Sequence, residues 1–211
     1  MHALTDEDVA ALAGAGVKLV CDLRSPPERE REPDRLPTPE PALLVPDEGF
    51  EKKTGFDMAQ ALEDDSIAWA QAYIEDVYSS LPGVAAATLR RLFDRLLAGE
   101  YPVIIHCMAG KDRTGFVVAV VLLALGVPRD RIAEDYMLTD EYFGFEPLRR
   151  AMVAALGGRQ PDPALVNIYR AQLPRLELAI ETLGDVDEYL EHEAGLTPER
   201  RRLLIELLTE P

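Results

Sequence analysis

Residues 103–125 read VIIHCMAGKDRTGFVVAVVLLAL, and this stretch decides the centre of the fold. It opens with a short β-branched run, Val103 to His106, which is typical of a buried strand. From Gly115 to Leu125 the residues carry no charge, and this run is too short to span a bilayer but suits a buried helix. The sequence therefore predicts a strand that leads through a loop into a helix in the middle of a domain.

A second buried strand is predicted near the N-terminus. The run from Val17 to Cys21 is short and apolar, and it delivers Asp22-Leu23-Arg24-Ser25 into a loop. The next stretch, Pro26 to Pro46, is rich in proline and charge. We expect no regular element there, except a short strand at Leu43 to Val45.

Helices are predicted over much of the remaining chain. The first one ends at Gly14 or Gly16. Apolar residues recur at helical spacing from Ile67 to Leu81 and again from Leu89 to Leu96, and we expect Pro82-Gly83 to separate these two helices. The part after Pro128 is predicted to be helical as well. The expected capping residues are Thr5, Ser66, Asp162, Asp185 and Thr197.

Length, charge and cysteine usage limit the possible functions. At 211 residues and 47% apolar composition, the chain is long enough for one domain, residues 1–211, with a sizeable core. The formal net charge of -16 argues against nucleic acid or an acidic membrane as partner, so an anionic substrate needs a focused local site. The two cysteines, Cys21 and Cys107, lack metal-ligand spacing, and we expect no metal. The first twenty residues are too acidic for a signal peptide, so we expect a cytoplasmic protein without membrane insertion.

The loop between the central strand and helix carries the chemistry. Cys107 and Arg113 are separated by five residues. A loop that enters a helix N-terminus points backbone N–H groups inward, and these groups bind a tetrahedral oxyanion and favour the thiolate form of a cysteine. The planar fork of an arginine matches the equatorial oxygens of a phosphoryl group. The predicted phosphate-binding residues are Met108, Ala109, Gly110, Lys111, Asp112 and Arg113.

Four neighbours of the cysteine have supporting roles in this prediction. Gly110 permits a left-handed turn that lets the amides converge, and Gly115 lets the helix approach the strand closely. Thr114 is placed to hydrogen-bond the sulfur. His106 is expected to orient the loop by hydrogen bonding rather than to transfer protons. An ordinary buried cysteine needs none of these neighbours, so their coincidence favours a nucleophile at Cys107.

These residues resemble the H-C-x5-R-[ST] signature of the protein tyrosine phosphatase superfamily. The wider set is similar to the bacterial tyrosine and lipid phosphatases of the mycobacterial secreted phosphatase B type. This set comprises the loop itself, Val20-Cys21-Asp22-Leu23-Arg24-Ser25 before it, Asp135-Tyr136-Met137-Leu138-Thr139 after it, and Tyr189-Leu190 and Gly195-Leu196-Thr197 near the end. The resemblance covers nearly the whole chain.

The resemblance implies an α/β fold with a central, short, mostly parallel sheet flanked by helices and a helix-rich C-terminal half. It implies hydrolysis without metal or cofactor, through a phosphocysteine intermediate. Phosphorylated proteins or phosphoinositides are then the expected partners. Family members usually carry a further segment before the Leu4-Thr5-Asp6-Glu7-Asp8 helix, and we expect this segment to be absent from this chain.

Expelling the leaving group needs a proton donor, and Asp112 is the first candidate. It lies inside the loop and is similar to the loop aspartate of phosphoinositide phosphatases with a C-x4-D-R pattern. Its neighbours Lys111 and Arg113 argue against this role, because positive charges keep a carboxylate ionised.

Asp22 and Asp47 are the alternative general acids, ranked second and third. Asp22 resembles the family's Asp-Leu-Arg motif, but it is equally consistent with a loop brace paired to Arg24 or Arg113. Asp47 follows Pro46 in the irregular region, where a solvated loop charge is the simpler interpretation.

Two further side chains have open roles. Lys111 is either a reader of an extra phosphate or a solvated cation. Cys21 is predicted to lie in the core, and a protective disulfide to Cys107 is the less favoured hypothesis.

Two other functions use a similar loop. A phospho-ligand-binding module would keep the anion cradle without turnover, although such a module usually loses either the cysteine or the arginine. A sulfurtransferase also holds a cysteine in an anion-binding loop, but that loop typically lacks the arginine six residues on.

Overall fold

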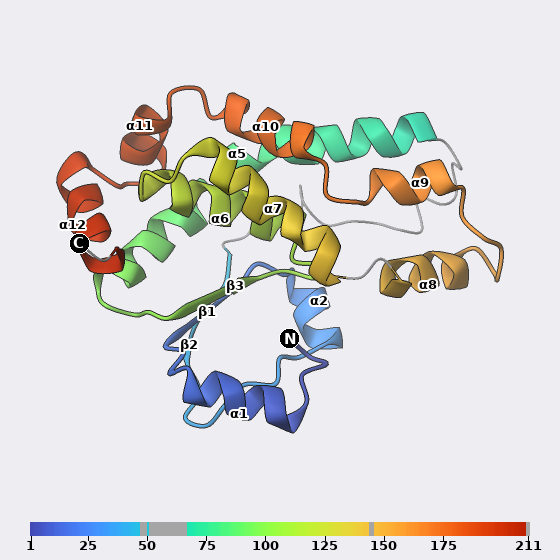
Figure 1. The fold of residues 1–211 in the computed structure, drawn as a ribbon, viewed down its shortest axis with the longest axis horizontal. Coiled ribbons are helices and arrows are strands. Elements are labelled where there is room, and N and C mark those ends of the chain that lie inside the picture. The colour runs from blue at the N-terminus through green and yellow to red at the C-terminus, as the bar shows by residue number, and fades with distance from the viewer. Residues whose placement is uncertain (47–49, 51–66, 144–145, 210–211) are drawn as a thin grey trace.

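The computed structural model describes residues 1–46, 50, 67–143 and 146–209. A sheet of three parallel strands lies at its centre, in the order β2-β1-β3 (Figure 1). Strand β1 spans Leu19–Asp22, β2 spans Ala42–Leu44 and β3 spans Val103–His106. The predicted α/β class with a short parallel sheet and a helix-rich C-terminal half is confirmed.

The strand register brings the two predicted loops together. In β1, Cys21 is opposite Ile105 of β3, and Asp22 is opposite His106. The backbone N–H of Leu23 then donates to the carbonyl of His106 at 2.8 Å. All four residues of β1 are buried, because this strand is the central one. The segments that follow β1 and β3 therefore leave the sheet side by side, at the carboxyl edge where open α/β sheets bind ligands.

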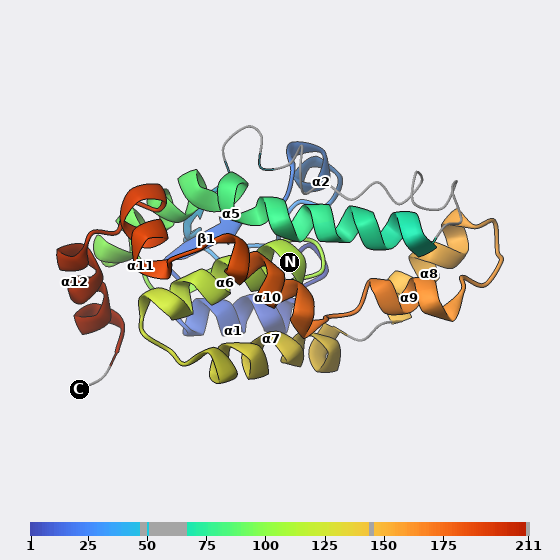
Figure 2. The same ribbon diagram turned by 90° about the horizontal axis from the view of Figure 1, so that it is seen from above.

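Helices lie on both sides of the sheet (Figures 1 and 2). Helices α5 (Ile67–Leu97), α6 (Asp112–Ala124), α7 (Arg129–Phe143) and α10 (Leu173–Thr182) lie on one side, and α1 (Asp6–Gly14), none of whose residues is buried, lies on the other. The C-terminal part adds α8 (Glu146–Ala155), α9 (Pro163–Ile168), α11 (Val186–Glu188), a π-helical turn (Tyr189–Glu193) and α12 (Pro198–Leu208). The predicted caps at Thr5, Asp162, Asp185 and Thr197 are confirmed. The predicted cap Ser66 lies outside the described residues.

Helix α5 runs without interruption through Pro82, so the predicted division into two helices is wrong. A proline inside a helix costs about 3 kcal/mol, because it lacks an N–H and clashes with the preceding turn. The buried face of α5 is continuous across this point, from Leu81 to Ala85 and Leu89. Full burial of one large apolar side chain contributes roughly 1.5–3 kcal/mol, so the packed face outweighs the proline. The hydroxyl of Tyr189 also donates to the Pro82 carbonyl at 2.6 Å.

The proline-rich segment also holds more structure than predicted. A six-residue helix, α2 (Pro26–Arg31), begins directly after Ser25. Two prolines are tolerated in its first turn, where backbone N–H groups have no partner inside the helix. A capping box joins Ser25 and Glu28, whose side chains each bond the other's backbone N–H. The short strand that was expected at residues 43–45 is present one residue earlier, as β2.

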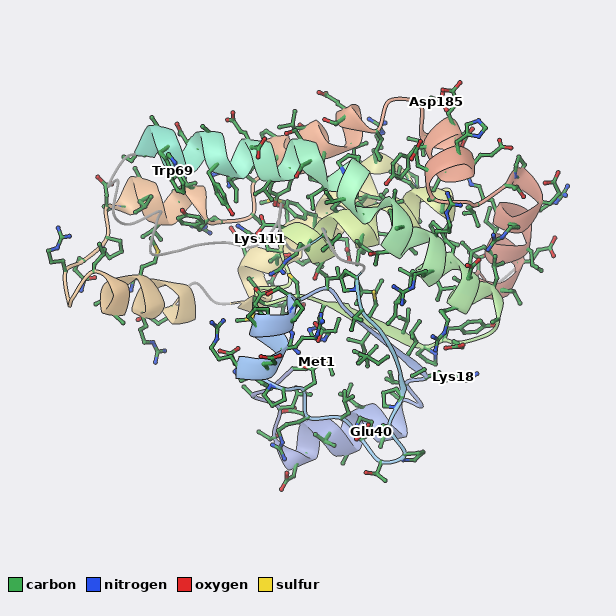
Figure 3. All side chains as sticks on the ribbon, turned by 180° about the vertical axis from the view of Figure 1, so that it is seen from behind. Met1, Lys18, Glu40, Trp69, Lys111 and Asp185 are labelled. Carbon is green, nitrogen blue, oxygen red and sulfur yellow. The ribbon has the colours of Figure 1, made fainter. Side chains whose placement is uncertain are left out.

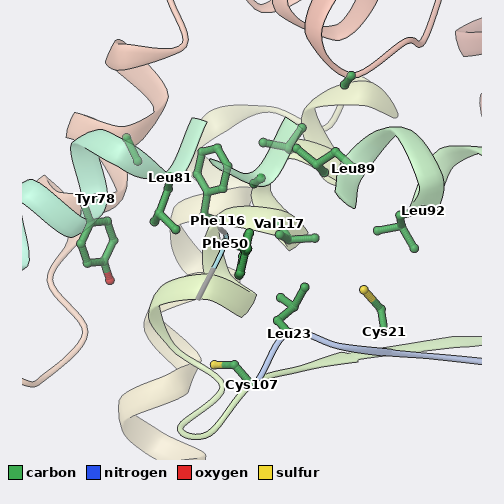
Figure 4. Close-up of a cluster of buried hydrophobic side chains, with 14 of the residues drawn as sticks. Cys21, Leu23, Phe50, Tyr78, Leu81, Leu89, Leu92, Cys107, Phe116 and Val117 are labelled. Carbon is green, nitrogen blue, oxygen red and sulfur yellow. The ribbon is translucent and has the colours of Figure 1, made fainter. Parts of the chain in front are cut away.

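The main core lies between the sheet and helices α5 and α6 (Figure 4). Strand β1 contributes Leu19 and Cys21, and the predicted buried helix α6 contributes Phe116 and Val117. A second, smaller cluster joins α6, α7 and α10 through Leu123, Ile132, Ile180 and their neighbours. Within the ranges that the structure describes, no helix is apolar for long enough to cross a bilayer.

Candidate active site

The loop from Cys107 to Lys111 joins β3 to α6, as the sequence predicts. Helix α6 starts at Asp112, earlier than the apolar run suggested, so Arg113 belongs to its first turn. Gly110 has φ +65°, the left-handed conformation that was expected there. The N-cap residue Lys111 makes no side-chain cap, which leaves the first amides of α6 available to an oxyanion.

Cys107 is a buried free thiol at the start of this loop. It is 6% exposed and belongs to the main core cluster, so only one end of the side chain can face a substrate. The side chain of Met108, by contrast, is exposed at the loop surface.

Arg113 is buried, and its guanidinium forms a bidentate ion pair with a carboxylate that the sequence analysis did not identify. Nη1 and Nη2 of Arg113 donate to Oε2 and Oε1 of Glu28 at 2.8 and 2.9 Å, and Nη1 also donates to the Leu23 carbonyl at 3.2 Å. Glu28 belongs to α2, so the capping box that starts this helix also aims the arginine. This fork-to-fork arrangement fixes both the position and the plane of the guanidinium.

Glu28 and Arg113 each stabilise the charged form of the other. Burial acts to raise the pKa of Glu28, but the hydrogen bonds and charge of Arg113 together with Ser25 lower it to about 2. Burial acts to lower the pKa of Arg113, yet Glu28 and the charges of Cys107 and Asp112 hold it above its ordinary value. Glu28 is therefore ionised at neutral pH, and Arg113 keeps its charge beside the thiol.

Asp22 is a brace in this structure. Both of its carboxylate oxygens accept from Arg24 at 2.8 Å, through Nε and Nη2. Burial acts to raise the pKa of Asp22, but these hydrogen bonds and the charges of His106 and Arg24 bring it below its ordinary value. A carboxylate that is buried, ionised and occupied by a guanidinium does not suit a proton donor. The structure thus favours the brace to Arg24 and contradicts a pairing of Asp22 with Arg113, whose partner is Glu28.

His106 makes the orienting hydrogen bonds that were expected of it. Its Nε2 lies 3.1 Å from Oδ2 of Asp34, and its Nδ1 lies 3.2 Å from the Cys107 carbonyl. Asp34 in turn accepts from Arg24 at 2.8 Å. Donor atoms of Asp22, Asp34 and His106 lie within 4.8 Å of one another, a spacing that a metal ion can use. Because Arg24 already bonds both carboxylates through Nε and Nη2, their oxygens are occupied by a fixed cation and the group does not fit a metal.

Asp112 stands in the first turn of α6 with two partners on the same oxygen. Tyr78 of α5 donates to Oδ1 at 2.6 Å, and Nζ of Lys111 lies 3.3 Å from it. The side chain of Asp112 is 25% exposed, which leaves it more accessible than either Asp22 or Arg113. Of the two candidate acids that the structure describes, Asp112 is the more exposed. Asp47, the third candidate, lies outside the described residues.

Lys111 is not the solvated cation that was considered. It is 5% exposed and lies near the centre of the molecule (Figure 3). Its Nζ donates to the Tyr169 carbonyl at 2.7 Å, next to its contact with Asp112. The lysine therefore ties the loop to the segment after α9.

Two supporting predictions are wrong. In the part of the chain that is described, the buried Oγ1 of Thr114 has no hydrogen-bond partner, so the expected contact with the sulfur is absent. Gly115 gives room to Tyr136 of α7 rather than to the strand. A Cβ at this position would lie 2.7 Å from the ring atom Cδ2, closer than side-chain atoms pack.

Cys21 is a core residue, as predicted. It lies opposite Ile105, two residues before Cys107, and the spacings of a sheet then place the two cysteine Cα atoms about 8 Å apart. A disulfide needs less than about 7 Å. Burial also raises the pKa of Cys21 to about 12, which leaves it as an unreactive thiol. Figure 4 shows that the two sulfur atoms do not point toward each other, so the structure does not support the disulfide.

Cys107 lies in a loop at the carboxyl edge of a parallel sheet, and Arg113 lies in the first turn of the buried helix that follows. This arrangement fits a phosphoric monoester hydrolase of the α/β class. The chain belongs to the tyrosine phosphatase family, whose model matches residues 1–210.

Three relatives illustrate this membership. The chain is 31% identical to the triple specificity protein phosphatase PtpB of Mycobacterium tuberculosis, over 92% of this chain and 83% of that protein. It is 30% identical to a tyrosine-protein phosphatase of Nostoc commune, over 76% of this chain and 53% of the relative. It is 27% identical to a putative tyrosine-protein phosphatase of Cupriavidus necator, over 87% and 67% of the two chains.

Proposed function

We propose that the chain hydrolyses phosphate monoesters, with phosphotyrosine as the first candidate substrate. Cys107 is only 6% exposed, and a phosphate carried on a long aromatic stem can reach such a buried sulfur. The mycobacterial relative is named a triple specificity phosphatase, so we keep phosphoserine or phosphothreonine and phosphoinositides as further candidates.

The proposed reaction has two steps, each with a named leaving group. The Cys107 thiolate attacks phosphorus, an S–P bond forms, and the ester P–O bond breaks as Asp112 protonates the departing oxygen. Water then attacks the phosphocysteine and gives a proton to Asp112, and the sulfur leaves as thiolate. Through both steps Arg113 and the loop amides hold the equatorial oxygens, where the transition-state charge resides.

One observation carries this proposal: Arg113, in the first turn of the helix that follows the Cys107 loop, is held in a fixed plane by two hydrogen bonds to Glu28. A buried cation fixed beside a buried thiol at an uncapped helix start is an anion site with a nucleophile inside it. An ordinary core cysteine needs no fixed cation nearby, and a surface arginine needs no bidentate ion pair to hold it.

Cys107→Ser is the decisive variant. We expect wild-type protein to release a burst of p-nitrophenol from p-nitrophenyl phosphate, and the variant to lose at least ~10³-fold in kcat, because a serine hydroxyl in this loop lacks a base to activate it. Phosphate affinity, measured by calorimetry, should survive in the variant. Undiminished hydrolysis by the variant would refute the role of Cys107.

A phospho-ligand-binding module is the second candidate, and the same measurements separate it. Wild-type protein that binds a phosphotyrosine peptide but shows neither burst nor turnover would establish binding without catalysis. The intact pair of Cys107 and Arg113 favours the enzyme.

A further inference from the structure

A chain of phenol groups ends on Asp112. The hydroxyl of Tyr78 lies 2.6 Å from Oδ1 of Asp112 and 2.7 Å from the hydroxyl of Tyr136. Tyr136 in turn has a hydrogen bond with the backbone of Gln172, at the start of α10. Both tyrosines are buried, at 0% and 3% exposure, and the hydrolysis proposed above assigns no role to either.

The directions of these hydrogen bonds follow from counting protons. The hydroxyl of Tyr78 donates to Oδ1 of Asp112, and this hydrogen bond uses its single O–H. The oxygen of Tyr78 is then free to accept, and the O–H of Tyr136 donates to it. The hydrogen bonds thus lead from the start of α10, through Tyr136 of α7 and Tyr78 of α5, to one carboxylate oxygen in α6.

The two oxygens of Asp112 are therefore not equivalent. Tyr78 and Lys111 both contact Oδ1. Among the described residues, no hydrogen bond or ion pair engages Oδ2 of Asp112. A protonated carboxyl with Oδ1 held by donors carries its hydrogen on the other oxygen, so Oδ2 is the atom that can present a proton to a leaving group.

We propose that Tyr78 is the positioning residue of the general acid, holding Oδ1 of Asp112 with Tyr136 behind it so that Oδ2 faces the departing oxygen. This inference rests on the proposed hydrolysis and on Asp112 as its proton donor. It assigns to Tyr78 an action through Asp112 and no contact with substrate.

The two phenols keep the protons that this role requires. The titratable groups that act on Asp112 are Tyr78, Lys111, Arg113, Tyr136 and Tyr169. Burial, followed by the charges of Asp112 and Tyr136, raises the pKa of Tyr78 well above its ordinary value. Burial raises the pKa of Tyr136 to about 12, although the hydrogen bond to Tyr78 opposes it. Both phenols therefore stay protonated, and remain donors, over the working pH range.

Tyr78→Phe tests the proposal with two substrates that differ in their leaving group. With phenyl phosphate, whose phenolate needs a proton, we expect kcat to fall about tenfold, part of the 10²–10⁴ that general acids contribute. With p-nitrophenyl phosphate, whose leaving group departs without help, the loss should stay below about threefold.

Tyr189→Phe is the matched control, because Tyr189 is another buried tyrosine whose hydroxyl bonds α5, at the Pro82 carbonyl. It should lower the melting temperature and leave the ratio of the two kcat values unchanged. In an Asp112→Asn background, Tyr78→Phe should cause no further leaving-group-dependent loss, since the acid is already gone.

Two results would overturn the inference: equal losses with both substrates, or additive losses in the double variant. If Tyr78→Phe does not fold, Tyr136→Phe decides, because it removes only the donor to Tyr78 and should change the ratio in the same direction by a smaller factor. Absence of hydrolysis by wild-type protein would instead refute the proposed function, which keeps the two failures distinct.

Discussion

At the scale of single residues, Glu28 decides where Arg113 points. Both terminal nitrogens of the guanidinium lie within 2.9 Å of the Glu28 oxygens, on a helix only six residues long. An arginine that is buried among apolar neighbours and lacks such a partner is costly, and breaking a buried pair typically destabilises by 3–5 kcal/mol. The carboxylate thus serves both the fold and the orientation of the guanidinium that we propose binds phosphate.

Glu28→Gln should lower kcat/KM for aryl phosphates by about tenfold, because the amide offers only one acceptor to the fork and Arg113 loses its fixed plane. Steady-state kinetics with p-nitrophenyl phosphate measure this loss. Arg29→Gln, on the same helix, is a suitable control and should have less effect. Unchanged kcat/KM in Glu28→Gln would show that the loop alone orients the arginine.

The same variant has a defined stability signature against pH. The pKa of Glu28 is lowered from 4.5 to about 2 by Arg113, so its ionised form stabilises the fold above about pH 4.5, and this stability is lost as pH falls toward 2. The contribution at neutral pH is on the order of 2–3 kcal/mol. In urea titrations, wild-type protein should lose more stability than Glu28→Gln between pH 5 and about 2. Parallel curves would contradict the ion pair.

Residue-scale prediction from the sequence succeeded where chemistry and spacing coincide. The loop after β3, with Cys107 at its start and a left-handed Gly110, was predicted correctly, whereas Arg113 lies in the first turn of α6 rather than in the loop. The roles of nucleophile and phosphate fork stay predictions. Glu28 was missed, although the Ser25-x-x-Glu28 spacing of a capping box was a signal for it. Tyr78 gave no such signal, because its position on the apolar face of a helix predicts only a core residue. The partner of its hydroxyl, Asp112, is distant in sequence.

At the scale of elements, side-chain caps were more reliable signals than prolines. Side-chain caps such as Thr5 and Asp162 satisfy free backbone N–H groups locally, so the neighbouring sequence reveals them. The sequence analysis gave proline too much weight as a helix breaker in two places. It did not prevent α2, because it sits in the first turn, and it did not divide α5, because packing on both sides of Pro82 holds the helix together. Tertiary contacts of that kind are invisible in a local window.

The packing of α6 against α7 yields a test with an internal control. Gly115→Ala should destabilise the protein by about 1–2 kcal/mol, because the new methyl overlaps the buried ring of Tyr136 and overpacking outweighs the gain in helix propensity. Gly83→Ala, in α5, meets no atom within 4 Å and should stabilise by roughly 0.5–1 kcal/mol. Urea titrations measure both. A stabilising Gly115→Ala would mean that the two helices move apart freely.

At the scale of the whole molecule, the net charge of the protein and the charge of its proposed substrates have the same sign and repel each other. The chain carries -16, while its proposed substrates are anions. Raising the ionic strength from about 0.01 M to about 0.15 M shortens the Debye length from about 30 to about 8 Å and screens this repulsion. For a phosphotyrosine peptide with acidic flanks, kcat/KM should therefore rise several-fold over this range. A peptide with basic flanks should show the reverse, and equal responses of both peptides would exclude long-range steering.

The ion pair between Glu28 of α2 and Arg113 of α6 has a consequence for ligand design. Arg113 is already immobilised by Glu28 as part of folding, so an incoming phosphate mimic meets a preorganised guanidinium and has little rotamer entropy to remove. A compound that instead displaced Glu28 from the fork would have to supply two coplanar acceptors of its own and to compensate for the stranded carboxylate. Scaffolds that leave this carboxylate in place therefore begin with an energetic advantage.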